Sequence, residues 1–266
     1  MRRDIQIALR SWLREHLPRR LLRLQRSVRH GYRYKRRRTG PLDYVAEFDH
    51  RDLRKAKGSI VWNDRWDEVS AATLQILRNL DLVEGGQTVL DFGCGIGRIS
   101  RALIEKYQIR VIAVDRSLWM RRHFRDYFLE KDFSHRALSS GEVQLWSDEE
   151  FVQNVPVIEE KVNLVLFIEV LQHIPEPILD QLLPQVTRTL SPGGKLFVFG
   201  NSVLDVDSSG SRATTPIAAF LRKQSPLLTI LREDVWQQVQ AGELNYTFSQ
   251  PRYSFLACRP ELLHHI

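Results

Sequence analysis

From residue 87 onward, short apolar segments alternate with longer segments in which apolar residues recur at helical spacing. One short segment, KVNLVLFI at 161–168, is almost uniformly apolar, which is typical of a strand buried on both faces. The alternation of strand and helix predicts an α/β fold with a doubly wound, mostly parallel sheet of about seven strands. Strands are expected at 88–91, 110–115, 142–146, 161–168 and 195–199, and helices at 98–107, 118–129 and 178–190.

The chain after residue 200 loses this alternation. A polar stretch at 201–216 precedes a short helix expected around 230–240. Two strand-like segments follow, at 244–249 and 253–258, with Pro251 in the turn between them. This pattern predicts an antiparallel hairpin added to one edge of the sheet.

Upstream of the sheet, the pattern is helical. Apolar positions over 42–80 favour helices, one of them capped by Asp64. The expected organisation is a helical arm at 1–40, a helical cap at 41–86 and an α/β core at 87–266.

The arm carries most of the positive charge of the chain. Residues 1–40 contain 14 Lys or Arg and 2 Asp or Glu, whereas the remainder contains 25 and 30. Apolar residues such as Leu9, Leu13 and Leu17 recur there at helical spacing, so a basic amphipathic helix is expected, with a break at Pro18. The net charge of +7 therefore describes the arm and not the ligand of the core.

Several roles remain open for this arm. Residues 1–30 could contact an anionic membrane surface, follow nucleic acid phosphates, form a lid or dock a partner. A mitochondrial presequence is disfavoured by Asp4, Glu15 and the scarcity of serine. We favour the membrane or lid role over nucleic acid, because no basic stripe continues into the core sequence. The oligomeric state is left open.

Two features of the composition limit the class of protein. No apolar run approaches the roughly 20 residues that a membrane span needs. The two cysteines, Cys94 and Cys258, are far apart and indicate neither a disulfide framework nor a metal cluster. A cytoplasmic protein, peripheral at a membrane if the arm binds lipid, is the expectation.

The first expected strand runs into a glycine-rich turn, VLDFGCGIGR at 89–98. Glycines lack Cβ atoms and let a ligand approach the backbone, and the following helix offers unpaired N–H groups. The glycines Gly93, Gly95 and Gly97 do not have the G-x-G-x-x-G spacing of dinucleotide sites. Asp91, two residues earlier, favours a cationic ligand over a diphosphate. The alternative interpretation of the glycines is a structural turn that binds no ligand.

This stretch resembles the first motif of the class I S-adenosylmethionine-dependent methyltransferases. Further resemblances follow in the family's order over about 87–200: AVD ending at Asp115, WSD ending at Asp148, FIEVLQHIP and SPGGKLFVF. Asn163 and Gln172 depart from residues that many members carry, which weakens any subfamily assignment. The resemblance implies a Rossmann-like fold and S-adenosyl-L-methionine as cofactor.

The resemblance also implies residue roles. The glycine turn and Asp91 would face the methionine moiety, Asp115 would accept both ribose hydroxyls, and Asp148 would accept from the adenine amino group. For Asp115 the alternative is a helix cap, and for Asp148 a solvated helix start capped by Ser147. The cofactor contacts expected are Asp91, Gly93, Cys94, Gly95, Gly97, Asp115, Arg116, Asp148, Ile168 and Glu169.

Two residues near the transferable methyl are candidate catalysts. Histidine suits proton transfer near neutral pH, so His173 is a candidate general base. Glu169, four residues earlier, would share a helix face with it if the segment were helical. A purely structural His173 is the competing interpretation.

Absent motifs narrow the acceptor. No [D/N]-P-P-[Y/F] signature follows the fourth expected strand, and no cysteine lies in a nucleophile loop. We therefore expect a small-molecule, lipid-linked or glycan-type acceptor, methylated on oxygen rather than nitrogen. The alternatives are an RNA or protein methyltransferase that uses the arm, and a non-catalytic binding module of the same fold.

Overall fold

The computed structural model describes residues 51–60, 66–130, 132–174, 176–202, 228–233 and 252–259. The chain divides after Asp43 into two units, and all described residues belong to the second. The predicted arm at 1–40 and the predicted cap residue Asp64 lie outside the described residues.

The described elements alternate as the pattern predicts. The strands are β1 (Thr88–Phe92), β2 (Arg110–Val114), β3 (Val143–Trp146), β4 (Val162–Ile168), β5 (Leu190–Ser202), β6 (Thr229–Glu233) and β7 (Arg252–Cys258). The helices are α3 (Leu53–Ile60), α4 (Trp66–Asn79), α5 (Arg98–Tyr107), α6 (Leu118–Leu129), α7 (Asp132–Ser140), α8 (Asp148–Ile158), the short 3-10 helix η2 (Leu171–His173) and α9 (Glu176–Thr189).

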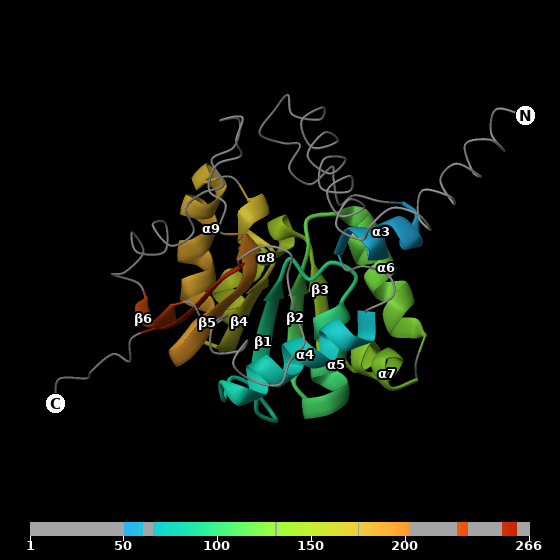
Figure 1. The fold of residues 1–266 in the computed structure, drawn as a ribbon, viewed down its shortest axis with the longest axis horizontal. Coiled ribbons are helices and arrows are strands. Elements are labelled where there is room, and N and C mark those ends of the chain that lie inside the picture. The colour runs from blue at the N-terminus through green and yellow to red at the C-terminus, as the bar shows by residue number, and fades with distance from the viewer. Residues whose placement is uncertain are drawn as a thin grey trace, which may run out of the picture. The chain divides into compact units, whose positions relative to one another are not determined.

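All seven strands form one sheet in the order β3-β2-β1-β4-β5-β7-β6. The neighbours from β3 to β5 pair in parallel, and β7 is antiparallel to both β5 and β6 (Figure 1). The strand order reverses between β1 and β4, which is where ligands of open α/β sheets bind. The predicted doubly wound sheet with an antiparallel C-terminal part is confirmed.

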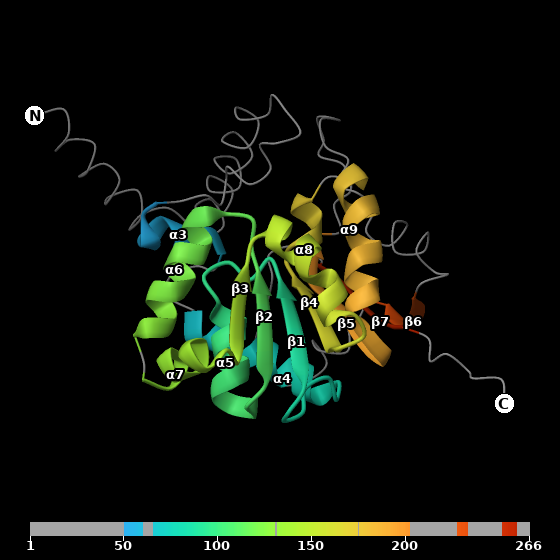
Figure 2. The same ribbon diagram turned by 180° about the vertical axis from the view of Figure 1, so that it is seen from behind.

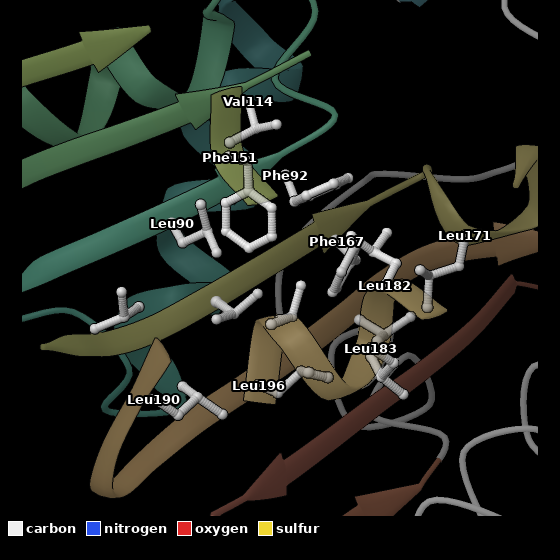
Figure 3. Packing of buried hydrophobic residues seen from close by; sticks show 14 of the residues in the cluster. Leu90, Phe92, Val114, Phe151, Phe167, Leu171, Leu182, Leu183, Leu190 and Leu196 are labelled. Atoms are coloured by element: carbon white, nitrogen blue, oxygen red, sulfur yellow. The ribbon is translucent and has the colours of Figure 1, made fainter. Parts of the chain in front are cut away.

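The sheet is covered on both faces because successive side chains of each buried strand point to opposite sides. In β1, Val89 packs in the cluster with α4, α5, α6 and α7, whereas Leu90 packs with α8 and α9. Figures 1 and 2 show these two helical layers from opposite sides. Figure 3 shows the second cluster, where the rings of Phe92 and Phe151 meet edge to face at 5.4 Å.

The C-terminal prediction is partly wrong. Residues 230–233, expected in a helix, belong to strand β6, which pairs antiparallel with β7. Ile230 packs against the core while Leu231 is exposed, so the segment has the alternation of an edge strand. Strand β7 is as predicted, but its neighbours are β5 and β6, and the predicted partner at 244–249 lies outside the described residues.

Three further elements differ from expectation. Helix α7 was not predicted, and α8 was anticipated only as a helix start capped by Ser147, the alternative interpretation of Asp148. Strand β5 begins at Leu190, before the SPGG sequence, and the pairing with β4 shifts register between Val162 and Leu164. Gly193 has a φ of 71°, which lets the chain make this irregularity within the strand. Among the described helices, none is long and apolar enough to cross a membrane.

Candidate functional site

The glycine turn is fastened to the neighbouring strand. The N–H groups of Gly93 and Cys94 both donate to the carbonyl of Val114, at 2.7 and 3.0 Å. Gly93, Gly95 and Gly97 all have positive φ values, of 74°, 57° and 82°. The backbone therefore folds tightly at the carboxyl end of β1, in a path that other residues adopt only with strain.

The outer two glycines face different neighbours. A Cβ on Gly97 would lie 2.5 Å from ring carbons of Phe124 and 2.8 Å from Phe128, both in α6. A Cβ on Gly93 would lie 2.4 Å from a methyl carbon of Val170, two residues after the end of β4. Gly97 thus serves the packing of α6 against the turn, and Gly93 the approach of the β4 end.

A cavity of about 640 Å³ lies at this edge of the sheet. Nine of the predicted site residues line it: Gly93, Cys94, Gly95, Asp115, Arg116, Asp148, Ile168, Glu169 and His173. These residues come from the ends of β1, β2, β3 and β4. Asp91 and Gly97 are not among the residues that line it. Their predicted contact with a ligand remains a prediction, and the structure gives both a role within the protein.

Asp91 lies beneath the turn with 4 % of its surface exposed. The hydroxyl of Ser100 donates to its Oδ2 at 2.6 Å. Burial raises the pKa of Asp91 to about 6, although the Ser100 bond and the charge of Arg98 act in the opposite direction. The carboxylate therefore holds the first turn of α5 in place below the cavity.

Asp115 joins the glycine turn to the start of α6. Its Oδ2 accepts from the N–H of Gly95 and its Oδ1 from the N–H of Ser117, each at 2.8 Å. The helix cap itself is Ser117, whose hydroxyl accepts from Met120 N–H at 3.1 Å. Each carboxylate oxygen has a further lone pair, so the predicted pairing with two hydroxyls stays chemically available. Burial raises the pKa of Asp115 to about 6, against the effect of both backbone bonds.

Asp148 lies at the helix start weighed from the sequence, and it also lines the cavity. Ser147 and Glu150 form a capping box that starts α8, with reciprocal bonds of 3.1 and 2.6 Å. Asp148 itself lines the cavity, and its Oδ2 lies 3.5 Å from Nε of Arg116. Its Oδ1 is buried and has no hydrogen-bond partner in the described part of the chain. Burial is the main cause that raises the pKa of Asp148, followed by Glu149.

The unfilled Oδ1 of Asp148 tests whether a nucleoside fits. Buried polar atoms in native proteins almost always have a partner, so the unpaired Oδ1 of a side chain that lines the cavity points to a donor outside the described residues. An exocyclic amino group supplies such a donor, and paired hydroxyls supply donors for Asp115. The side chains present therefore fit an adenosine-containing cofactor.

Glu169 and His173 line the same cavity, but they do not share a helix face. Glu169 has a φ of 59°, in the left-handed region, and its N–H donates to the carbonyl of Phe199 at 2.8 Å. Only Leu171–His173 forms a helical turn, of the 3-10 type. The condition for the i, i+4 arrangement, a helical segment, is therefore not met, because Glu169 has a left-handed backbone and lies outside the short helix. Such backbone outliers cluster at functional sites, where strain positions a side chain.

One wall of the cavity was not predicted from the sequence. Helix α9 contributes residues at i, i+3, i+4 and i+7, and α8 contributes one turn of its own. These residues are Ile178, Gln181, Leu182 and Gln185 of α9, and Glu149, Val152 and Gln153 of α8. The helical period of α9 was visible in the sequence, but nothing in it indicated that this face would line a site.

Two chemical roles receive no support from the described residues. Burial raises the pKa of the Cys94 thiol, and Asp115 and Asp91 add to this effect, so its nucleophilic thiolate is disfavoured. No group of three or more His, Cys, Asp or Glu within the described ranges could hold a metal ion.

Comparison with known families decides the affiliation of this region. Residues 89–194 match the family described as "Methyltransferase domain". This segment is a class I methyltransferase domain. Its match begins one residue into β1 and ends within β5, so it contains all nine predicted residues that line the cavity.

Curated methyltransferases are related to the domain at low identity. The trans-aconitate 2-methyltransferase of Azoarcus sp. (strain BH72) is 28% identical over 143 residues, which cover 52% of this chain and 49% of that protein. The ribosomal protein L11 methyltransferase of Vibrio cholerae (strain ATCC 39541) is 26% identical over 175 residues, covering 66% and 50%. The chain thus spans about half the length of these curated relatives.

A solved structure shares the fold of the methyltransferase domain. It is Haemonchus contortus phosphoethanolamine N-methyltransferase 2 in complex with phosphomonomethylethanolamine and S-adenosylhomocysteine. The TM-score is 0.52 at 17% identity, over 84% of this chain and 61% of that chain. At this identity the likeness concerns the fold alone.

Proposed function

We propose that the chain is an S-adenosylmethionine-dependent methyltransferase that methylates a hydroxyl of an uncharged small molecule, free or linked to a lipid or glycan. The observation that carries the proposal is the cavity at the β1–β4 crevice, with the carboxylate residues Asp115 and Asp148 on its wall. The family of the domain and the named relatives support the reaction type.

Three carboxylates and the glycine turn would hold the cofactor. Asp115 would accept the ribose hydroxyls, Asp148 the adenine amino group, and the Gly93–Gly95 backbone and Glu169 would border the methionine part. S-adenosylmethionine, when bound, supplies a methyl group already activated on a positively charged sulfur. The protein must therefore align the acceptor and manage its proton, which is mainly a matter of positioning.

Glu169 and His173 are placed for this task. Both line the cavity next to the end of β4, close to the glycine turn through Val170. In the proposed reaction His173 would accept the proton that the acceptor hydroxyl loses when the methyl–sulfur bond breaks and the methyl–oxygen bond forms, and Glu169 would orient the acceptor. The left-handed backbone at Glu169 keeps that side chain in position without a helix.

The charge of the described lining bears on the acceptor. It contains the carboxylates of Asp115, Asp148, Glu149 and Glu169 and the guanidinium of Arg116, which pairs with Asp148. This balance attracts a cationic cofactor and repels an anionic acceptor. The wall of α8 and α9 adds three neutral glutamine amides, which suit hydroxyl and carbonyl groups. The relatives' own acceptors differ in charge and size, so the preference has to come from this cavity.

Two measurements test the proposal. Calorimetric titration of the full chain with S-adenosylmethionine comes first, and absence of binding would leave a non-catalytic module of the same fold. Release of S-adenosylhomocysteine is then followed with matched acceptors that carry a hydroxyl, an amine or a carboxylate. Turnover with the hydroxyl compound supports the proposal, whereas transfer to RNA or protein alone overturns the acceptor class.

Variants separate binding from chemistry. His173→Asn should lower kcat by about 10²–10⁴-fold, the usual contribution of a general base, with little change in cofactor affinity. His135→Asn in α7 is the matched control, because His135 is exposed and does not line the cavity. An unchanged kcat in His173→Asn would assign that residue a structural role.

A further inference from the structure

Helix α6 presents an exposed stripe of two leucines and two arginines. Leu118, Arg122, Arg125 and Leu129 follow one another at i, i+4, i+7 and i+11, and all four side chains are exposed. Leu118 is 49 % and Leu129 53 % exposed. The stripe runs the length of the helix, about 16 Å at the usual rise per residue. We call these four residues the α6 stripe.

The side chains of the α6 stripe do not contribute to the packing of the hydrophobic core. The opposite face of α6 carries Met120, Phe124 and Phe128, each almost fully buried. Single exposed leucines are common on protein surfaces and need no explanation. Two leucines aligned with two arginines on one helix face form an amphipathic pattern that packing does not account for.

An aromatic residue extends the stripe toward α3. Cζ of Arg122 lies 4.5 Å from the centre of the Trp119 ring, and Cζ of Arg51, just before α3, lies 5.5 Å from it. Helix α3 packs beside α6, because Ala56 and Met120 belong to one buried cluster (Figures 1 and 2). Arg54 and Lys55 of α3 are also exposed.

The α6 stripe begins at the edge of the active-site cavity. Arg116 lines the cavity two residues before α6, and Met120 lines it from the first turn of the helix. A surface in contact with the stripe would therefore also lie near this side of the cavity.

We propose that the α6 stripe, with Trp119 and Arg51, docks on an anionic lipid bilayer. Leucine and tryptophan side chains would enter the boundary between headgroups and acyl chains, and the arginines would pair with anionic headgroups. Nucleic acid fits the α6 stripe less well than a bilayer does. Its phosphates would pair with the arginines, but Leu118 and Leu129 would have no function in such a contact. Asp126 lies beside the stripe and moderates its charge.

The basic sequence of residues 1–40, with 14 Lys or Arg against 2 Asp or Glu, supports a bilayer as partner. Stable attachment of a peripheral protein generally requires two membrane signals. The arm lies outside the described residues, so the α6 stripe is the signal that the structure itself supplies. The proposal does not depend on the proposed methyl transfer.

The test is co-sedimentation of the full chain with vesicles of phosphatidylcholine alone and of phosphatidylcholine mixed with phosphatidylglycerol. Wild type should bind the anionic vesicles and lose affinity as salt is raised. Removing a charge at an anionic surface lowers partitioning about fivefold, so Arg122→Gln/Arg125→Gln should lower it about 30-fold. Leu118→Ser/Leu129→Ser should lower it about tenfold, because half-exposed leucines gain only part of a full burial.

Matched controls come from other faces of the same domain. Val157→Ser in α8 removes an apolar side chain that is 61 % exposed, and Arg78→Gln in α4 removes an exposed arginine. Both should bind vesicles as wild type does. Every variant keeps residues 1–40 and should bind S-adenosylmethionine with wild-type affinity if the cofactor assignment holds, because none of the substituted residues lines the cavity.

Three outcomes would overturn the proposal. The full chain fails to bind anionic vesicles, or the stripe variants bind them as tightly as wild type, which would leave the arm as the whole signal. In the third outcome, the stripe variants lose affinity for an RNA oligonucleotide while vesicle binding is unchanged.

Discussion

Replacing Gly97 by alanine separates a packing role of the third glycine from a ligand role. The Cβ would lie 2.5 Å from two ring carbons of Phe124, whereas carbon atoms normally approach to about 3.5–4.0 Å. Phe124 is fully buried and stacks on Phe128 with ring centres 4.3 Å apart, so it has little room to move away. The substitution therefore combines a steric clash with a left-handed backbone.

Gly141 provides the matched control for this substitution. Its φ of +80° is close to the +82° of Gly97, but a Cβ there would meet nothing within 4 Å. Gly141→Ala should cost about 1–2 kcal/mol, the price of the left-handed conformation alone. Gly97→Ala should cost about 1–3 kcal/mol more for overpacking, or about 2–5 kcal/mol altogether.

Urea unfolding of the full-length variants, followed by far-UV circular dichroism, measures this difference. A total of about 2–5 kcal/mol is a large part of the 5–15 kcal/mol that is typical for the stability of a protein domain. Equal losses in Gly97→Ala and Gly141→Ala would show that the α6 rings do not press on the turn. A stable Gly97→Ala variant that no longer binds S-adenosylmethionine would return Gly97 to the ligand role expected from the sequence.

Four other variants address the cavity and its carboxylates. Gly93→Ala places a Cβ 2.4 Å from a Val170 methyl at the cavity wall, so calorimetry should show weaker cofactor binding than in wild type. Asp148→Asn can replace the unpaired acceptor with a donor, and cofactor affinity should fall about tenfold in the same titration, with the α8 cap intact. Asp115→Ala should weaken cofactor binding by a few kcal/mol at most, and unaltered affinity would contradict the ribose assignment. The pKa of Asp91 is raised from 3.8 to about 6 in the folded protein, which therefore binds more protons than the unfolded chain between these values. The contribution of Asp91 to the unfolding free energy is thus fully present below about pH 4 and is lost as the pH rises through about 6. The loss amounts to about 3 kcal/mol. Urea unfolding across this pH range should show that loss in wild type and a smaller loss in Asp91→Asn.

The cavity lining at the ends of the parallel strands was largely predictable because its signals are local. Strand, glycine turn and helix follow one another in VLDFGCGIGR, and the parallel sheet brings Asp115 and Asp148 to the same edge. A carboxylate at the end of a parallel strand needs only the correct strand order to reach the crevice. The sequence could not tell which acids line the cavity and which support it from below, as Asp91 does.

Other features depended on contacts between distant segments. Residues 230–233, part of the segment expected to be helical, belong to strand β6 because β7 offers them a pairing partner and the core accepts Ile230. Strand propensity depends strongly on such neighbours, and a short segment does not reveal them. The glutamine wall of α9 is likewise a matter of which helix face meets the cavity.

The order of strands and helices, the glycine turn and the acids at strand ends follow from patterns within a few residues, because backbone geometry and hydrophobic period are local properties. The separate roles of the glycines within the turn do not follow from such local patterns. Gly97 meets Phe124, which is 27 positions later, and Gly93 meets Val170, which is 77 positions later. Such contacts exist only once the chain has packed, so tertiary structure alone decides which side chain each glycine makes room for, and that Gly93 but not Gly97 lines the cavity.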